Sequence, residues 1–73
     1  MIIKPVDKNI IRIIDEDMLY TIIESYGSYD GIHPIYTIIK EDAYASPLEV
    51  ISDLDRDHLN KHFKSDISLL FNS

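Results

Sequence analysis

Short runs of apolar, β-branched and aromatic residues recur through the first half of the chain between polar clusters, a pattern typical of β-strands. Ile10–Ile14, written IIRII, predicts a buried strand, and Lys4–Asp7 predicts an extended lead-in to it. Two similar segments follow, Leu19–Glu24 (LYTIIE) and Ile35–Lys40 (IYTIIK). The segment between them, SYGSYDGIHP, is rich in turn-forming residues, so the pair predicts an antiparallel hairpin. Alternation then places Leu19, Thr21 and Ile23 on one face, and Tyr20, Ile22 and Glu24 on the other.

A helix competes with the first strand of this hairpin. Asp17 is a suitable N-cap, and Gly27 is a suitable C-terminal stop. Between them, apolar residues stand at helical spacing: Met18, Leu19, Ile22, Ile23 and Tyr26. The likeness to Ile35–Lys40 and the content of β-branched residues favour the strand, and the helix remains the alternative for residues 17–26.

The segment Ser46–Glu49 has the pattern of a helix N-terminus. Serine caps, proline suits the first helical position, and a glutamate three residues after the cap completes a capping box. Leu48, Ile51 and Leu54 follow at helical spacing. The sequence therefore predicts one main helix over Pro47–Phe63, with Lys61 and Lys64 at the C-terminal end that favours cations.

The chain ends in a short apolar run, Asp66–Phe71, which predicts either a segment packed into the core or an exposed docking peptide. Together the elements predict a single α+β domain over residues 1–73. In it, a small antiparallel sheet, formed by one strand and a hairpin, is packed by one main C-terminal helix. So small a domain buries only about 60% of its unfolded surface, and without cysteine it has no disulfides. Self-association is the remaining aid to stability, so a homodimer is expected.

The net charge of −6 is concentrated in the middle of the chain. Residues 13–57 carry eleven acidic residues against Lys40 and Arg56, a net charge of −9, whereas residues 1–12 and 58–73 are each net positive. Such a centre repels nucleic acid and attracts basic surfaces, of which DNA-binding surfaces are the commonest in a cell. No apolar run reaches the roughly 20 residues of a membrane span.

The acidic residues of this middle region, with one tyrosine suited to interfaces, are the candidate partner-binding residues. On the predicted helix, Glu49, Asp53 and Asp57 recur at every fourth residue and share one face, with only Arg56 nearby to offset their repulsion. The full candidate set is Asp15, Glu16, Asp17, Glu41, Asp42, Tyr44, Glu49, Asp53 and Asp57.

Metal binding and catalysis find little support in the sequence. The alternating aspartates of SDLDRD resemble a calcium loop, but the positions that require glycine and glutamate hold His58 and Lys64. His58 and His62 stand four residues apart, a zinc-compatible spacing, yet no third ligand is evident. Without a glycine-rich phosphate loop, nucleophile elbow or cysteine, we expect no enzyme, no metal and no cofactor.

The protein resembles the small acidic proteins with which bacteriophages inhibit host proteins by imitating DNA, among them inhibitors of the sliding clamp and of the nucleoid protein HU. The resemblance is carried by the size, the missing cysteines, the acidic residues 13–57 and the tail. Asp66–Phe71 is similar to the peptide that docks on the bacterial sliding clamp, except that Asp66 stands where that peptide has glutamine.

The resemblance implies a non-enzymatic inhibitor that occupies the basic DNA-binding surface of a host protein in the bacterial cytoplasm. The protein itself would bind neither nucleic acid nor membrane. An antitoxin or regulator that neutralises a basic toxin or enzyme is the alternative, and it predicts apolar contacts that depend little on salt. The two classes therefore differ in the salt dependence of binding.

Overall fold

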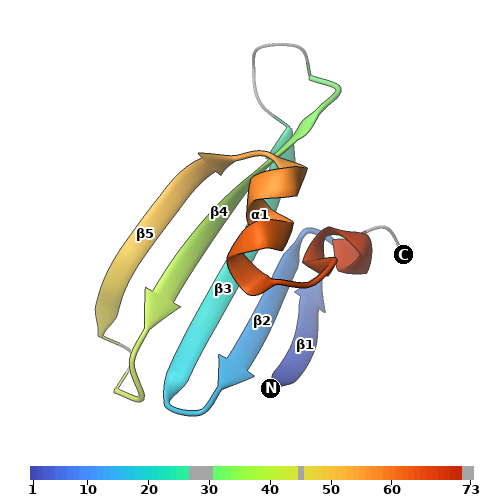
Figure 1. Ribbon diagram of the computed structural model, residues 1–73. Coiled ribbons are helices and arrows are strands. Elements are labelled where there is room, and N and C mark those ends of the chain that lie inside the picture. Colours follow the sequence, from blue (N-terminus) through green and yellow to red (C-terminus); the bar gives the residue numbers. More distant parts are fainter. Residues whose placement is uncertain (27–30, 45, 72–73) are drawn as a thin grey trace.

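The computed structural model describes residues 1–26, 31–44 and 46–71. Five antiparallel strands follow one another in a meander of order β1-β2-β3-β4-β5 (Figure 1). A short helix and a 3₁₀ helix come after the last strand. Their bounds are β1 Ile2–Asp7, β2 Ile10–Asp15, β3 Met18–Tyr26, β4 Pro34–Glu41, β5 Pro47–Leu54, α1 Arg56–Phe63 and η1 Ile67–Phe71.

The three strands expected in the first half of the chain are confirmed. Ile10–Ile14 lies within β2, and the two similar segments form β3 and β4, which pair in antiparallel register with Ile22 opposite Ile38. The helical alternative for residues 17–26 is wrong, because Met18–Tyr26 is one continuous strand. Its stop residue, Gly27, lies outside the described residues. The extended lead-in is itself a strand, β1, paired with β2.

The predicted fold class is wrong, because the protein is mostly a five-stranded sheet with one short helix. The helix predicted over Pro47–Phe63 begins only at Arg56, and Pro47–Leu54 forms the edge strand β5 instead. There Val50 pairs with Ile39 and Ile51 with Ile38, so hydrogen bonds with β4 replace those of the expected helix. Pro47 is compatible with this role because it stands at the first residue of an edge strand.

The helical spacing of Ile51 and Leu54 has a different origin from the one expected. In a regular strand, residues three apart lie on opposite faces. Here the register shifts between the pairs Ile38–Ile51 and Tyr36–Leu54, and Asp53 within the shift has a positive φ of 59°. This β-bulge inserts one extra residue, so Ile51 and Leu54 both pack against the core.

The N-cap of α1 is Asp55, not Ser46. The Asp55 side chain accepts a hydrogen bond from the His58 backbone N–H at 2.8 Å, as an N-cap does. At the other end Lys64 adopts a left-handed conformation, and the Ser65 N–H donates to the Asn60 carbonyl at 3.1 Å. The chain then turns into η1, which two hydrogen bonds of 3.0 Å hold to α1: the Asn60 amide donates to the Ser68 hydroxyl, and its oxygen accepts from the Ser68 backbone N–H.

The core lies between one face of the sheet and the layer formed by α1 and η1 (Figure 1). Inward residues of β2, β3 and β4 meet Leu59 from α1 and Ile67 and Phe71 from η1. The rings of Tyr36 and Phe71 are 5.4 Å apart, and those of Tyr20 and Phe63 are 5.3 Å apart. The buried apolar residues are Ile11, Ile13, Ile22, Tyr36, Ile38, Leu59, Ile67 and Phe71.

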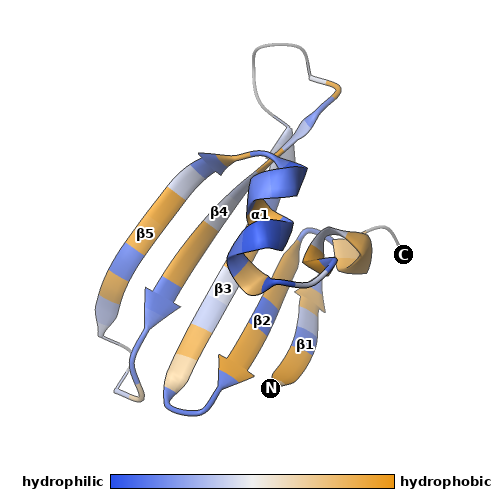
Figure 2. Cartoon of the chain, in the orientation of Figure 1, coloured by the Kyte–Doolittle hydropathy of each residue, from blue (hydrophilic) through white to orange (hydrophobic). Residues whose placement is uncertain are grey.

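The opposite face of the sheet carries many apolar residues, and no described element packs on it. The cross-strand pairs Ile10–Ile23, Ile14–Leu19 and Ile39–Val50 point away from α1, because their neighbours along each strand point into the core. Apolar segments lie along β1, β2, β4 and β5 and are interrupted by polar ones (Figure 2). The strand pairing places Lys4, Asp7, Arg12, Thr21 and Thr37 on the same face as these apolar pairs. We call this the open face, and its apolar residues are Ile2, Ile10, Ile14, Leu19, Ile23, Ile35, Ile39 and Val50.

Candidate functional site

Two acidic turns lie next to each other at one end of the sheet. Glu16–Asp17 connects β2 to β3, and Asp42 begins the connection from β4 to β5 (Figure 1). Because β3 and β4 pair, the two turns are neighbours, and Glu16, Asp17 and Asp42 line one shallow hollow of about 290 Å³. Glu41 pairs with Leu19, which lines the same hollow. We call Glu16, Asp17, Glu41 and Asp42 the acidic end.

The local backbone fixes both turns. Asp15 pairs with Met18, so Glu16 and Asp17 form a two-residue hairpin loop, and Glu16 has the positive φ (56°) that such tight loops require at one position. In the second turn, the Asp42 carboxylate accepts hydrogen bonds from the backbone N–H groups of Tyr44 at 2.9 Å and Ser46 at 3.0 Å. Asp42 therefore shapes its turn as well as adding charge, and the Tyr44 side chain beyond it is 88% exposed.

Among the described residues, the acidic end has no counterion. Within residues 1–26, 31–44 and 46–71, no ion pair involves Glu16, Asp17, Glu41 or Asp42. The nearest lysine along the chain, Lys40, lies instead over the ring of Tyr20 at 6.0 Å. These carboxylates keep their charge available to an external cation, since no side chain of the described residues neutralises them.

Asp15 lies at the same end of the molecule but on the other side of the sheet. It lines a separate hollow with Met1, His62 and Lys64, where positive charge is close by. The structure therefore brings together four of the five acidic residues predicted from the two turns and separates Asp15 from them. The sequence places these residues in two clusters, and only the pairing of β3 with β4 makes the clusters adjacent.

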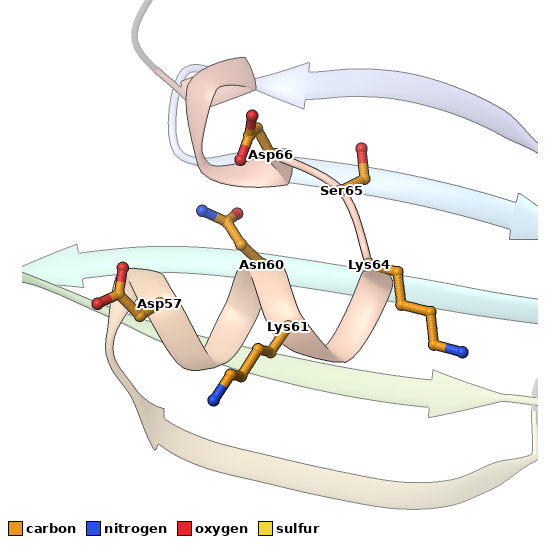
Figure 3. A pocket seen from close by; sticks show the side chains of 6 residues that line it. All are labelled: Asp57, Asn60, Lys61, Lys64, Ser65 and Asp66. Atoms are coloured by element: carbon orange, nitrogen blue, oxygen red, sulfur yellow. The ribbon is translucent and has the colours of Figure 1, made fainter.

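The predicted acidic helix face does not exist. Glu49 lies on β5 opposite Lys40, Asp53 lies in the bulge, and Asp57 lies in the first turn of α1. Asp53 and Asp57 are at the end of the sheet away from the acidic end. Figure 3 shows Asp57 in a shallow hollow on the outer side of α1 and η1, together with Lys61 and Lys64, so its surroundings are of mixed charge.

The histidines do not form a metal centre. No group of three or more His, Cys, Asp or Glu side chains suited to a metal ion occurs within the described residues. His58 Nδ1 lies 2.7 Å from Asp55 Oδ1, and the His62 ring packs on Phe63 at 5.0 Å. The hydrogen bonds from the His58 backbone N–H and ring hold the pKa of Asp55 below its usual value.

One acidic residue that sequence reasoning did not single out is buried. Glu24 is 7% exposed and accepts a hydrogen bond of 2.7 Å from the Tyr36 hydroxyl. Burial, together with this bond, raises the pKa of Tyr36 to about 12. The signal was present in the alternation, which put Glu24 on the same face as Tyr20 and Ile22. The pair satisfies its own polar atoms, and we assign it a structural role.

The tail packs into the core and is not displayed as a docking peptide. Ile67, Ser68 and Phe71 are buried, while Leu69 and Leu70 are 65% and 42% exposed. A clamp-type peptide needs its phenylalanine end free to enter a partner's pocket, and here Phe71 lies against Tyr36. Of the two alternatives for residues 66–71, the structure supports core packing.

Comparisons with known proteins identify no relative. No protein-family model, no curated protein and no solved structure matches the chain. Among the helices of the described residues, none has the length and apolar character needed to cross a membrane. The arrangement of the residues themselves is therefore the basis for a functional proposal.

Proposed function

We propose that this protein is a non-enzymatic inhibitor that presents its acidic end to the basic DNA-binding surface of a bacterial protein, in the cytoplasm. The observation that carries the proposal is the juxtaposition of two acidic turns that have no counterion among the residues that the structure describes. Arginine and lysine side chains that normally hold phosphates would meet Glu16, Asp17 and Glu41, with Tyr44 adding exposed contact area beside them.

The spacing of the turns lets one basic surface contact both. Adjacent strands are about 4.8 Å apart, so the centres of the two hairpin turns lie about 10 Å from each other. The net charge of −6 adds long-range attraction to any basic surface.

Matched charge variants test the proposal. The first, Glu16→Gln/Asp17→Asn/Glu41→Gln, removes three charges from the acidic end and leaves Asp42 to shape its turn. The second, Glu49→Gln/Asp53→Asn/Asp57→Asn, removes the same number of charges from the scattered acidic residues. The immobilised protein and both variants are used to capture proteins from a bacterial lysate at about 50 mM and about 200 mM salt.

We expect the wild type and the second variant to retain a DNA-binding protein at the lower salt concentration and to release it at the higher one. Added duplex DNA should release it as well. The first variant should bind at least about tenfold more weakly than the wild type, because only this variant lacks the proposed contacts. Equal capture by the two variants would show that the acidic end is not the binding surface. The same would follow if the amount captured changed with neither the salt concentration nor added DNA.

A further inference from the structure

The open face is unusual for the surface of a soluble sheet. Its eight apolar residues come from all five strands, and all but Ile35 lie in apolar cross-strand pairs. The row of Lys4, Arg12 and Thr21 lies between these pairs. Ile2 and Val50 at its two margins are 55% and 60% exposed. Monomeric proteins rarely expose apolar patches of more than a few hundred Å². The solvated face of an antiparallel sheet normally has mostly polar residues, so the eight apolar residues on this one indicate that something covers it.

We propose that a second copy of this chain covers the open face, so that two sheets pack face to face in a sandwich with their strands antiparallel. Five strands about 4.8 Å apart and about 22 Å long give a footprint on the order of 500 Å². Interdigitating side chains add to this area, which approaches the roughly 600–1,000 Å² that each partner buries in a stable interface. The proposal does not depend on the acidic end.

The distribution of charge favours a second copy over the basic partner proposed for the acidic end. The open face carries Lys4 and Arg12, which pair across β1 and β2, whereas Glu41 lies at its margin. Asp7 lies on the same face, so a basic partner gains no net attraction there, whereas a second copy can place Lys4 opposite Asp7. Most acidic residues lie in turns or on the other side of the sheet, so the chain's net charge of −6 does not prevent two open faces from meeting.

The order of charged residues along the strands selects the orientation. Lys4 lies in a cross-strand row with Arg12, and Asp7 lies in the next row with Ile10, farther from the acidic end. Consider a two-fold axis that lies in the plane between the two sheets, perpendicular to the strands and midway between these rows. This axis places Lys4 of each copy opposite Asp7 of the other. It also puts the two acidic ends at opposite ends of the dimer. An axis along the strands would bring both acidic ends together, where they would repel.

The edge strands of the sheet disfavour strand addition, so two copies are expected to associate through the open face. The outer strand β1 contains Pro5 and a register shift beside it, and β5 contains two register shifts. Proline and bulges interrupt the row of donors and acceptors that another strand would need. A copy of the chain is therefore not readily added as a sixth strand, and the apolar surface left for association is the open face.

The oligomeric state tests the interface. Sedimentation of the wild type should give twice the chain mass of 8.5 kDa, with a midpoint of thermal unfolding that rises with protein concentration. The variant Ile23→Thr/Ile39→Thr keeps β-branched residues but removes apolar surface, and should weaken dimerisation at least about a hundredfold. Ile32→Thr, the same change at an isoleucine that is 72% exposed outside the open face, should leave the dimer intact.

A wild-type protein that is monomeric at all concentrations would overturn the proposal and assign the open face to a different partner, such as a toxin. A dimer that the double variant leaves unchanged would also overturn it. If the double variant does not fold, the concentration dependence of wild-type unfolding still decides between a dimer and a monomer. High salt should leave this dimer intact, which distinguishes it from binding at the acidic end.

A charge exchange tests the orientation. Asp7→Lys places like charges opposite Lys4, and Lys4→Glu places like charges opposite Asp7, so each variant alone should dimerise about tenfold more weakly than the wild type. An equimolar mixture restores both opposite-charge pairs and should form a heterodimer of wild-type affinity. A mixture that associates no better than its components would exclude the antiparallel arrangement.

Discussion

At the scale of single residues, the hydrogen bond between Glu24 and Tyr36 places a carboxylate inside the apolar core. A carboxylate that is 7% exposed needs a hydrogen-bond donor, and the Tyr36 hydroxyl supplies one at 2.7 Å. Alternation along β3 placed Glu24 on the inner face, but nothing local indicated its partner. Tyr36 is opposite Glu24 only because β3 and β4 pair in this register.

Replacing Tyr36 with phenylalanine should destabilise the protein by about 1–3 kcal/mol, because the Glu24 carboxylate loses its donor while its burial persists. Urea unfolding measures the change. Glu24→Gln, which keeps an acceptor for the hydroxyl, serves as the control and should cost less. An unchanged midpoint in Tyr36→Phe would mean that water replaces the hydroxyl without loss.

The same contact predicts a dependence on pH. The pKa of Tyr36 is raised from 10.0 to about 12, so the folded state holds the phenolic proton more tightly than the unfolded state. The resulting stabilisation is complete below the unfolded pKa of about 10 and is lost as the pH rises from about 10 to about 12. Comparison of wild type with Tyr36→Phe over this interval isolates the effect, and the variant should lose less stability.

At the scale of elements, β5 shows how one sequence pattern has two structural solutions. Ser46–Glu49 and the spacing of Leu48, Ile51 and Leu54 satisfy the local requirements of a helix. The edge of β4 offers hydrogen bonds to the same segment, and the bulge at Asp53 brings Ile51 and Leu54 to one face of a strand. Pairing with a distant strand, which no local window contains, decided the outcome.

The bulge gives a prediction at this scale. Asp53 has a φ of 59°, a conformation that disfavours β-branched side chains. Asp53→Val should therefore destabilise the protein by about 1–2 kcal/mol, whereas Asp53→Gly should be neutral or stabilising. Ser52→Val, a neighbouring exposed position without positive φ, is the control for the added β-branching. Equal unfolding midpoints for Asp53→Val and Asp53→Gly would contradict the strain argument.

At the scale of the whole molecule, the chain completes its core with its last described element. Phe71 of η1 packs beside Tyr36 of β4, and Ile67 of η1 is buried in the same core. A domain of 73 residues has few such contacts to lose. The tail is thus part of the fold, in keeping with the core alternative for residues 66–71.

Alanine substitutions in the tail test that assignment. Phe71→Ala should destabilise the protein by about 3–5 kcal/mol, because a large buried side chain leaves a cavity. Leu69→Ala, at a side chain that is 65% exposed, should change stability by less than about 0.5 kcal/mol. Thermal unfolding at a fixed protein concentration measures both, and a docking peptide would give small effects at both positions.

By itself, the sequence determined the elements whose signal is local. The β-branched and aromatic runs Ile10–Ile14, Leu19–Glu24 and Ile35–Lys40 are enough to indicate strands, because such side chains suit the pleated surface of a sheet. It also determined the acidic character of the turns. The tertiary structure alone decided that Pro47–Leu54 is a strand, that two acidic turns are neighbours, and that a second apolar face is left open. Each of these depends on which strands pair, and strand pairing joins residues that are distant in the sequence.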